Sequence, residues 1–592
     1  MVGVEERFKR DVWVLALKNA IEHGGRALPG PVISGIMGRY PGLRSRAREV
    51  VSVVNEVVKE VNKLSLEDQV RLAKERFPEV FEERRRRVEQ KAGLPPLPNV
   101  NRYEVIKTRF APNPDFLIHL GNARPAILSY EYARMYDGFM ILRFEDTDPK
   151  TKPPMPEAYL LVKEDLRWLG VRWDEEYIQS LRIDIYYSVA KDLLRVGGAY
   201  VDLCSQEEFQ KYKLKRVPCP HRDQEVSRNL ELFDRMLEGY YGEGEAVVRV
   251  KTDLNHPDPS VRDWVAFRII DTDTNPHPVT GSRYAVWPTY NFAAAVDDHL
   301  MGVTHILRGK EHMVNTVKQL FLYKHMNWQY PEVINLGRLK LEGFILSKSK
   351  IKQLLREFPD RFKGPSDVRF GTIASLRNRG IEAEAIRELI MEVGVKSTDA
   401  SISWDNLSAI NRKIIDSTTK RIMAVYDPVL LIVDGYEGPS IIKARYHPDA
   451  EELGIREIRL DVVSNKLNVY IEREDAKLAE RGGLRLMELC NVKDLKMVAK
   501  DTLLGEFDGL GIDKAKRKGY QIIQWVSRGD NVHVVVTYPR GLELTHKRGI
   551  AERSLLDIGE GRRVQLIRKG FFKISNIRGA PESEVELIFI HQ

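Results

Sequence analysis

The spacing of hydrophobic residues predicts helices in the first part of the chain. Up to about residue 94, apolar positions recur at helical spacing, as at Val54, Val57 and Val61. Ser65 begins a segment of capping-box form, which is typical of a helix start. Residues 94–98 are rich in proline, so we expect them to end the helices and form a stiff linker.

The period of the pattern changes after this linker. Strands are predicted at 103–110 and 139–144, and helices at 119–136, 156–169 and 183–196. A strand, a helix and a second strand in this order begin a doubly wound parallel sheet. Residues 200–284 are irregular and rich in turns, so we interpret them as a domain inserted into the sheet, whose pattern resumes at 284–292.

The last third of the chain predicts a different architecture. A helical region extends to about residue 415, and short alternating strands follow at 429–433, 467–471, 532–536 and 564–567. Such spacing argues for β-barrels or sandwiches. The expected order is a helical extension, the first half of a Rossmann-type α/β domain, an insertion, the second half, a helical subdomain and all-β barrels, at 1–98, 99–199, 200–284, 285–350, 351–415 and 416–592.

Composition and charge narrow the class of protein. The 592 residues are 43% hydrophobic and 30% charged, which suits several folded, soluble domains. The formal net charge of +8 permits a polyanionic partner. Because no apolar run approaches the roughly 20 residues of a membrane span, and acidic residues near the N-terminus do not fit a secretory signal, we expect a cytoplasmic protein without membrane contact. Three cysteines cannot form a disulfide scaffold for this length.

Four arginines at 84–87 form the strongest charge run of the predicted helical extension. A solvated helix face is the ordinary explanation, and contact with a phosphate is the alternative.

Candidate chemistry begins at residues 119–122, His-Leu-Gly-Asn, where the first helix of the predicted sheet starts. A helix N-terminus at the carboxyl end of a strand offers unpaired N–H groups and a partial positive charge to phosphate. Gly121 would let a nucleotide approach the backbone, and His119 could donate a hydrogen bond to an α-phosphate as charge builds up. Taken alone, the same residues fit an ordinary helix start with a packing glycine.

A basic loop at 345–350, Ile-Leu-Ser-Lys-Ser-Lys, changes this balance. Together with residues 119–122 it resembles the paired HIGH and KMSKS signatures of class I aminoacyl-tRNA synthetases. The flanking segments at 108–114 and 142–149 narrow the resemblance to the glutamyl and glutaminyl branch. The resemblance covers about residues 101–592 and implies a class I catalytic domain with an insertion that holds the acceptor end of tRNA.

The sequence departs from the family pattern at Phe116, Asn122 and Ile345. Asn122 replaces a histidine and can donate through its amide, but it cannot become cationic. Lys348 is kept, and the resemblance implies that its charge neutralises the β- and γ-phosphates of ATP. The resemblance assigns catalysis to His119, Asn122 and Lys348, and ATP binding to Pro112, Asn113, Pro114, His119, Gly121, Asn122, Arg338, Leu339, Leu346, Ser347 and Lys348.

The same resemblance implies a glutamate pocket. In it, Arg109 reaches the substrate carboxylate, Asp146 takes the α-ammonium group, and Tyr290 bonds the head of the side chain. Each could instead be a buried ion pair or a core aromatic. Arg308 favours glutamate over glutamine, because an arginine at the γ position pairs with a carboxylate and is left without a counter-charge by an amide. A salt bridge within the sheet is the alternative for Arg308.

The predicted insertion also contains Asp202, Cys204, Cys219 and His221, as two pairs with one residue between the members of each. This mixed set of O, S and N ligands could bind zinc. Some glutamyl enzymes resemble it with a cysteine at the position of Asp202, and a buried cysteine pair beside a surface histidine is the alternative. Zinc is therefore a candidate in addition to ATP and Mg²⁺.

The C-terminal strands resemble the two-barrel anticodon-binding region of glutaminyl enzymes and of the archaeal kind of glutamyl enzyme, at 469–475, 523–527 and 564–572. The resemblance therefore implies a glutamyl-tRNA synthetase of the archaeal kind that acts as a monomer. Its expected partners are glutamate, ATP and tRNA(Glu), with tRNA(Gln) as a further candidate. Alternatives are a glutaminyl-tRNA synthetase, a tRNA-binding scaffold on a decayed synthetase fold, and a truncated tRNA-modifying glutamyl transferase, which would lack the barrels.

Overall fold

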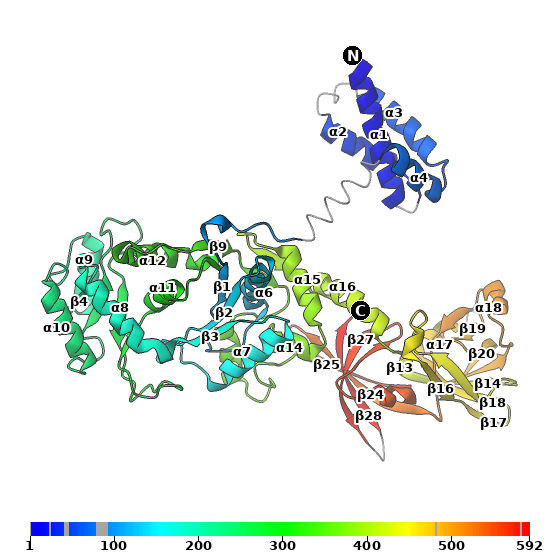
Figure 1. The fold of residues 1–592 in the computed structure, drawn as a ribbon. Helices are drawn as coiled ribbons and strands as arrows, with labels where there is room; N and C mark the ends of the chain where they lie inside the picture. Colours follow the sequence, from blue (N-terminus) through cyan, green and yellow to red (C-terminus); the bar gives the residue numbers. More distant parts are fainter. Residues whose placement is uncertain (1, 23–24, 41–46, 78–92, 480–481, 580–582) are drawn as a thin grey trace. The chain divides into compact units, whose positions relative to one another are not determined.

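The computed structural model describes residues 2–22, 25–40, 47–77, 93–479, 482–579 and 583–592 (Figure 1). It divides into two compact units, Met1–Pro95 and Pro96–Gln592, and each is described by itself. The arginine run at 84–87 lies outside the described residues. Within the described ranges, no helix is both long enough and apolar enough to cross a membrane.

The described part of the first unit is helical, as its sequence predicts. Its helices are α1 (Val2–Glu22), α2 (Pro29–Arg39), α3 (Ala47–Val61) and α4 (Leu66–Arg76). Val54, Val57 and Val61 of α3 are buried in a core that α3 shares with α1 and α2. Ser65 caps α4, since its side chain accepts a hydrogen bond from the N–H of Asp68 at 3.1 Å.

A parallel sheet lies at the centre of the second unit. Its strand order is β3-β2-β1-β8-β9, and every neighbouring pair is parallel. The strands are β1 (Lys107–Phe110), β2 (Phe139–Phe144), β3 (Glu175–Ile178), β8 (His305–Gly309) and β9 (Glu332–Leu336). Helix α6 (Leu120–Met135) connects β1 to β2, which confirms the predicted start of a doubly wound sheet.

The first strand is shorter than predicted. It begins at Lys107, which pairs with Phe139 at the start of β2. Residues 103–106 therefore have no strand beside them on that edge, and Tyr103 instead packs its ring against His305, with the centroids 5.4 Å apart. The predicted strand over 103–110 is wrong in its first half, because an apolar stretch does not show where its partner strand begins.

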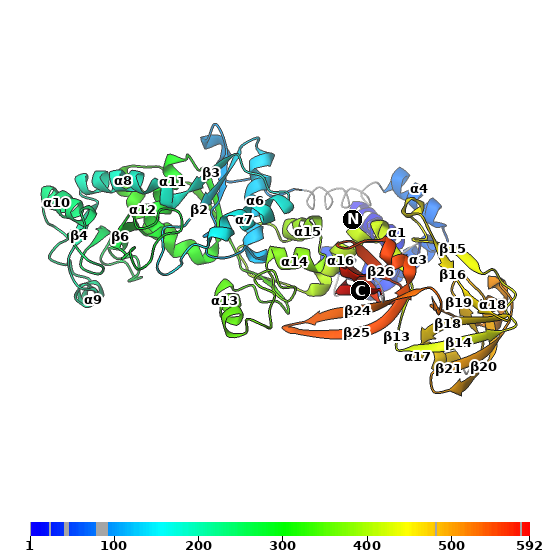
Figure 2. The same ribbon diagram turned by 90° about the horizontal axis from the view of Figure 1, so that it is seen from below.

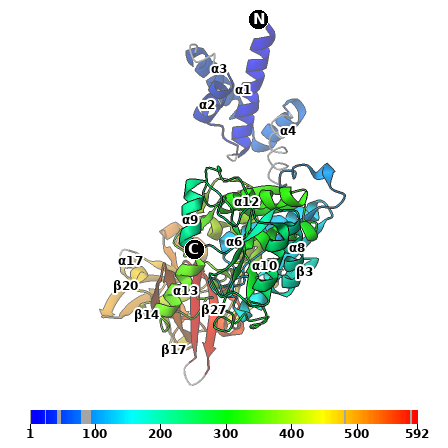
Figure 3. The ribbon, with the colours of Figure 1, turned by 90° about the vertical axis from the view of Figure 1, so that its left-hand side faces the viewer.

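Residues 200–284 contain more regular structure than predicted. An antiparallel sheet of order β4-β5-β6-β7 is formed by β4 (Ala199–Asp202), β5 (Val247–Val250) and β6 (Val265–Ile269) of this region and by β7 (Val286–Pro288), which follows it. It shares one core with the helices α8 (Ile183–Arg195), α10 (Val226–Leu237), α11 (Tyr290–Leu300) and α12 (Met313–Met326). Figure 3 looks onto this end of the unit. Strands this short, between long turns, leave little periodicity in the sequence.

A helical region follows the parallel sheet. It contains α13 (Lys348–Glu357), α14 (Ile373–Arg379), α15 (Ala383–Val393) and α16 (Trp404–Ile415). Backbone bonds tie its start to α6: the N–H of Gly371 donates to the carbonyl of Ile345 at 3.1 Å, and the N–H of Leu120 donates to the carbonyl of Gly371 at 3.2 Å. The loop before α13 and the N-terminus of α6 are therefore held together.

The C-terminal region consists of two large sheets with separate cores (Figure 2). The predicted strands at 429–433, 467–471, 532–536 and 564–567 lie in β14 (Pro428–Asp434), β18 (Lys466–Glu472), β24 (Asn531–Arg540) and β26 (Arg563–Leu566). The first two belong to a sheet of order β17 (Asp461–Val463), β18, β14, β21 (Thr502–Phe507), β20 (Asn491–Ala499), β19 (Leu484–Leu486) and β22 (Gln521–Ile523). The last two belong to a sheet of order β12 (Arg421–Ile422), β26, β27 (Gly570–Arg578), β28 (Glu584–His591), β24, β25 (Glu543–Glu552) and β13 (Ala424–Tyr426). The expected all-β region with barrel-like sheets is confirmed.

One hairpin of this region reaches back to the helical region. Strand β24 and β25 (Glu543–Glu552) form it, and Figure 2 shows it extending toward α13. Leu542 at its turn packs against the cluster that contains Phe116 and Ile351. The guanidinium of Arg369 donates to the carbonyl of Leu542 at 3.3 Å. The C-terminal sheets thus contact residues next to the helix-start motif at 119–122 and next to the basic loop at 345–350.

Candidate active site

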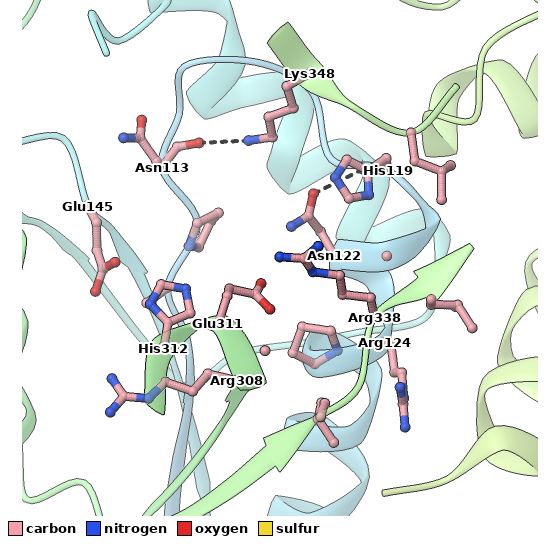
Figure 4. Close-up of a pocket in the computed structure, with 18 of the residues that line it drawn as sticks. Asn113, His119, Asn122, Arg124, Glu145, Arg308, Glu311, His312, Arg338 and Lys348 are labelled. Atoms are coloured by element: carbon pink, nitrogen blue, oxygen red, sulfur yellow. Dashed lines mark hydrogen bonds between the residues drawn. The ribbon is translucent and has the colours of Figure 1, made fainter. Parts of the chain in front are cut away.

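A cavity of about 1260 Å³ lies at the carboxyl end of the parallel sheet (Figure 4). Residues at or just after the ends of β1, β2, β8 and β9 line it, together with the start of α6 and the loop before α13. From β1 the sheet continues through β2 to β3 on one side, and through β8 to β9 on the other. The order of the strands therefore reverses between β1 and β8. Crevices at such a point are where doubly wound sheets bind ligands.

The start of α6 presents the predicted helix-start motif to the cavity. His119 directly precedes α6, and its N–H donates to the side-chain oxygen of Asn122 at 3.4 Å. The Nδ1 atom of His119 is buried and has no hydrogen-bond partner among the described residues. A Cβ at Gly121 would lie 2.9 Å from the His119 ring, so a glycine is needed there to let the ring lie over the turn. The packing of the His119 ring is therefore a second reason for a glycine at position 121, besides the expected approach of a nucleotide.

His119 is held in its neutral form. Burial, together with the positive charge of Lys348, lowers its pKa from 6.5 to about 4. At neutral pH its imidazole therefore carries one N–H and can donate a single hydrogen bond without adding a full charge to the cavity.

Lys348 is the first residue of α13, and its side chain crosses to the segment before α6. Its ammonium group donates to the carbonyl of Asn113 at 3.2 Å, as Figure 4 shows, and to Oδ1 of Asp115 at 3.0 Å. Ser347 caps α13 by accepting a hydrogen bond from the N–H of Lys350 at 3.4 Å. The two motifs that the sequence singled out, more than two hundred residues apart, thus face the same cavity.

The other predicted nucleotide residues are also in the wall, with one exception. The cavity is lined by Pro112, Asn113, Gly121, Asn122, Arg338, Leu339, Leu346 and Ser347. Pro114 is buried outside the wall, where its carbonyl accepts a hydrogen bond from the N–H of Met155 at 2.9 Å. Phe116, a departure from the family pattern, is buried in a core with Ile351 of α13, which gives it a packing role.

Arg308 is a buried cation with neutral partners. It lies in β8 and is 4% exposed. Its guanidinium donates to the hydroxyl of Thr316 at 2.7 Å, that of Tyr330 at 3.1 Å, that of Tyr290 at 3.5 Å and the amide oxygen of Gln319 at 3.2 Å. Its Nε is buried without a partner, and no carboxylate of the described chain lies within ion-pair distance. The alternative of a salt bridge for Arg308 is therefore wrong.

His312 adds to this side of the cavity, although the sequence did not single it out. Its ring lies beside that of Tyr290, with the centroids 5.4 Å apart. Burial and the nearby charge of Arg308 lower the pKa of His312 to about 4. At neutral pH His312 is therefore uncharged, and it does not add a second positive charge beside Arg308.

Arg109 differs from Arg308, because it already has a counter-charge. Its Nε lies 3.2 Å from Oδ1 of Asp298, which also accepts from Arg143 at 2.8 Å. A second guanidinium nitrogen of Arg143 lies 2.9 Å from Glu145. Burial raises the pKa of Glu145, and Arg143 acts against this shift. The network leaves Glu145 in the wall of the cavity, where Arg109 also lies.

Asp146 does not reach the cavity wall, contrary to the expected contact with the α-ammonium group. It is completely buried and accepts hydrogen bonds from the N–H of Ser180 at 2.8 Å and the hydroxyls of Ser180 and Tyr159, both at 2.7 Å. Its neighbour Glu145 faces the cavity instead. The two side chains follow the end of a strand, where successive residues point to opposite sides, and the sequence does not show which side is open.

The four candidate zinc ligands come together at the end of β4 and in the loops beside it. One ligand atom from each of Asp202, Cys204, Cys219 and His221 lies within 4.8 Å of the others. Nδ1 of His221 is 3.4 Å from Sγ of Cys204 and 3.1 Å from Oδ1 of Asp202, which is 3.8 Å from Sγ of Cys219. These separations fit the edges of a tetrahedron around zinc. The second oxygen of Asp202 is 2.6 Å from Nε of Arg249, which leaves Oδ1 for a metal.

Two family models match the chain. The catalytic domain of tRNA synthetases class I (E and Q) matches residues 105–417, and the anti-codon binding domain of the same family matches residues 419–505.

Relatives match it over almost its whole length. The glutamate–tRNA ligase of Hyperthermus butylicus is 54% identical over 97% of this chain and 100% of its own. That of Ignicoccus hospitalis is 53% identical over 98% of each, and that of Thermococcus kodakarensis is 48% identical over 99% of this chain and 100% of its own. A solved glutamate tRNA ligase from Elizabethkingia meningosepticum, in complex with its amino acid, aligns at TM-score 0.38 and 24% identity over 53% of this chain and 70% of that one.

The low pKa of His119 gives a testable prediction. Lys348→Met should raise it from about 4 toward, but not to, 6.5, because the substitution removes the nearby charge and leaves the burial. The pH dependence of carbethoxylation at His119, followed by peptide mass spectrometry, measures this pKa. Since the unfolded chain takes up the proton at higher pH than the folded one, His119 lowers stability as the pH falls from 6.5 toward 4, and Lys348→Met should narrow that window.

Lys350→Met is the matched control, because Lys350 is an exposed lysine of the same helix. An unchanged pKa of His119 in Lys348→Met, or an equal rise in both variants, would contradict the electrostatic explanation.

Proposed function

Because the chain belongs to the class I tRNA synthetases for glutamate and glutamine, we propose that it activates glutamate with ATP and attaches it to the 3′-terminal adenosine of tRNA(Glu). The relatives named above, each a glutamate–tRNA ligase, support glutamate as the amino acid. The observation that carries the choice of substrate is Arg308, a buried cation in the cavity wall that has no carboxylate partner in the described part of the chain. A bound γ-carboxylate would supply the missing counter-charge, and an amide would not.

The pocket suggests how glutamate is held. Arg308 pairs with the γ-carboxylate, and Tyr290, whose hydroxyl is 3.5 Å from that guanidinium, bonds the same group. Glu145 takes the α-ammonium in place of Asp146, because it is the carboxylate that lines the cavity. Arg109 orients the substrate from the end of β1, with Asp298 fixing its guanidinium.

The chemistry is a displacement at the α-phosphorus of ATP. An oxygen of glutamate's α-carboxylate attacks, the bond to the β-phosphate breaks, and pyrophosphate leaves with the electron pair. His119 and Asn122 donate hydrogen bonds to the α-phosphate region, and Lys348 neutralises the leaving pyrophosphate. Mg²⁺ enters with ATP and supplies further charge neutralisation. The terminal adenosine hydroxyl then attacks the acyl carbon, and AMP leaves.

The insertion and the C-terminal barrels serve tRNA. We assign the acceptor-end insertion to 200–284, the two halves of the catalytic domain to 99–199 and 285–350, the helical subdomain to 351–415 and the anticodon-binding barrels to 416–592. The anti-codon binding model covers the start of the last of these. Transfer to tRNA(Gln) as well, and action as a monomer, belong to the same proposal.

Aminoacylation tests the proposal directly. Purified protein receives ATP, Mg²⁺ and labelled glutamate or glutamine, with tRNA(Glu) and tRNA(Gln) in turn. Attachment of glutamate to tRNA(Glu) is the expected result, and attachment to tRNA(Gln) would show that the enzyme does not discriminate between them. Attachment of glutamine would support the glutaminyl alternative, and tRNA binding without any attachment would support the scaffold.

Removal of the Arg308 charge should affect one substrate. Arg308→Gln should raise the KM for glutamate about 30-fold or more, since losing one partner of a buried charge pair costs about 2 kcal/mol or more. The KM for ATP should change less than about twofold, because nucleotide and amino acid bind different walls. Steady-state aminoacylation measures both.

The matched control is Arg195→Gln. Arg195 is an exposed arginine at the end of α8 that pairs with Asp192 and does not line the cavity. It should leave both KM values unchanged. An equal rise of the two KM values in Arg308→Gln would refute the role of Arg308.

We also propose that Asp202, Cys204, Cys219 and His221 bind zinc, which would stabilise the insertion without a part in the chemistry. Purified protein should contain about one zinc ion per chain by mass spectrometry of metals. Cys204→Ser should lose it, and a chelator should lower the Tm of the wild type because the metal binds the folded chain. Cys490→Ser, at a buried cysteine outside the cluster, should keep the metal. Metal-free wild type with an unchanged Tm in chelator would refute the site.

A further inference from the structure

A carboxylate between the two nucleotide-binding motifs has no role in the chemistry above. Asp115 lies in the loop between β1 and α6, and its side chain is 16% exposed and lines the cavity. Its Oδ1 lies 3.0 Å from the ammonium nitrogen of Lys348, and its Oδ2 lies 3.4 Å from that of Lys352. Lys348 and Lys352 are one turn apart on α13, so one carboxylate bonds both through separate oxygens.

Both lysines depend on this carboxylate for a counter-charge. Within the described ranges, no other carboxylate lies within 4.0 Å of Lys348 or Lys352. Burial acts to raise the pKa of Asp115, but the two lysines outweigh it and the pKa lies below its usual value, so the group is ionised. Two cations on one anion leave this corner of the cavity with a net positive charge.

A phosphate chain in the cavity would meet Lys348, which lines it, and Lys352 follows one turn later on α13 with its ammonium group on the same carboxylate. Lys348 is the residue that the proposed function places on the leaving pyrophosphate, and in this structure its ammonium group bonds Asp115 and the carbonyl of Asn113. The ammonium group of Lys348 now lies 3.0 Å from the carboxylate of Asp115. If it kept this contact while binding the β- and γ-phosphates, two negative groups would lie close together, which is unfavourable. Lys348 must therefore move away from Asp115 to neutralise the phosphates.

We propose that Asp115 holds the place of the β- and γ-phosphates in the nucleotide-free enzyme, and that Lys348 and Lys352 pass from Asp115 to the phosphates when ATP binds. This inference rests on the proposed function. It makes Asp115 a positioning residue and Lys352 a second phosphate-binding lysine. When pyrophosphate leaves, the lysines return to Asp115, which therefore competes with the product and hastens its release.

The geometry explains why such a group is useful. In its absence, Lys348 in the cavity wall and Lys352 one turn later on α13 would repel each other and turn into solvent. Asp115 keeps their stems in place, together with the contact between the Phe116 ring and the Lys352 ammonium, 5.7 Å from its centroid. The site is thus arranged before ATP arrives.

Titration calorimetry with Mg²⁺-pyrophosphate and with ATP tests the inference. Asp115→Asn keeps the shape of the side chain and removes the competing charge, so both ligands should bind roughly three- to tenfold more tightly, as expected for one partly buried ion pair. In aminoacylation the KM for ATP and kcat should fall together, since pyrophosphate leaves more slowly.

Three further variants complete the test. Glu357→Gln makes the same change of charge at the other end of α13 and should leave pyrophosphate affinity at the wild-type value. Asp115→Glu restores the charge and should bring the affinity back toward the wild type. Lys352→Gln should weaken pyrophosphate binding, and it keeps the proposal testable if Asp115→Asn does not fold.

The sign of the change separates the proposal from a structural role. Pyrophosphate that binds Asp115→Asn as weakly as the wild type, or more weakly, would overturn the inference, because loss of a structural anchor can only loosen the site. Wild type that glutamylates tRNA alongside this result leaves the proposed function intact. Wild type that binds neither ATP nor pyrophosphate would refute both.

Discussion

The cavity buries positive charge, and the arrangement of the whole site follows from the cost of doing so. A buried guanidinium or ammonium group is stable only with an anion or a full set of acceptors around it. Arg109 and Arg143 share Asp298, and Lys348 has Asp115. Among the described residues, the hydrogen-bond partners of Arg308 are neutral oxygens. In the proposed function, the charge that is left over marks where the ligand's own negative charge belongs.

The parallel sheet and the bonds around α13 make this arrangement possible. Four strands deliver side chains to one edge of the sheet, and the backbone bonds through Gly371 fix the loop at 345–350 against the start of α6. Groups far apart in sequence thus share a cavity because strands and backbone hydrogen bonds hold the segments that carry them. Precise placement of this kind is the main catalytic resource for phosphoryl chemistry, in which the protein itself forms no covalent bond.

Much of the fold and part of the site followed from the sequence. Periodicity gave the strand 139–144 and the C-terminal strands, and motif resemblance gave His119 and Lys348. The missed features depend on the partner of a residue rather than on its type. Only the structure shows that Glu145 faces the cavity while Asp146 is saturated by Ser180 and Tyr159, or that Asp115 meets a lysine 233 positions later.

The contact of Leu542 with the cluster of Phe116 and Ile351 limits how freely this chain can be recombined. The hairpin that carries Leu542 is part of the C-terminal sheets, and Phe116 lies three residues before His119. A chimaera that joins these sheets to the catalytic domain of a relative with a small side chain at position 116 would lose one ring of the cluster against which Leu542 packs. The two parts are therefore expected to evolve as a matched pair, with changes in one compensated at the other.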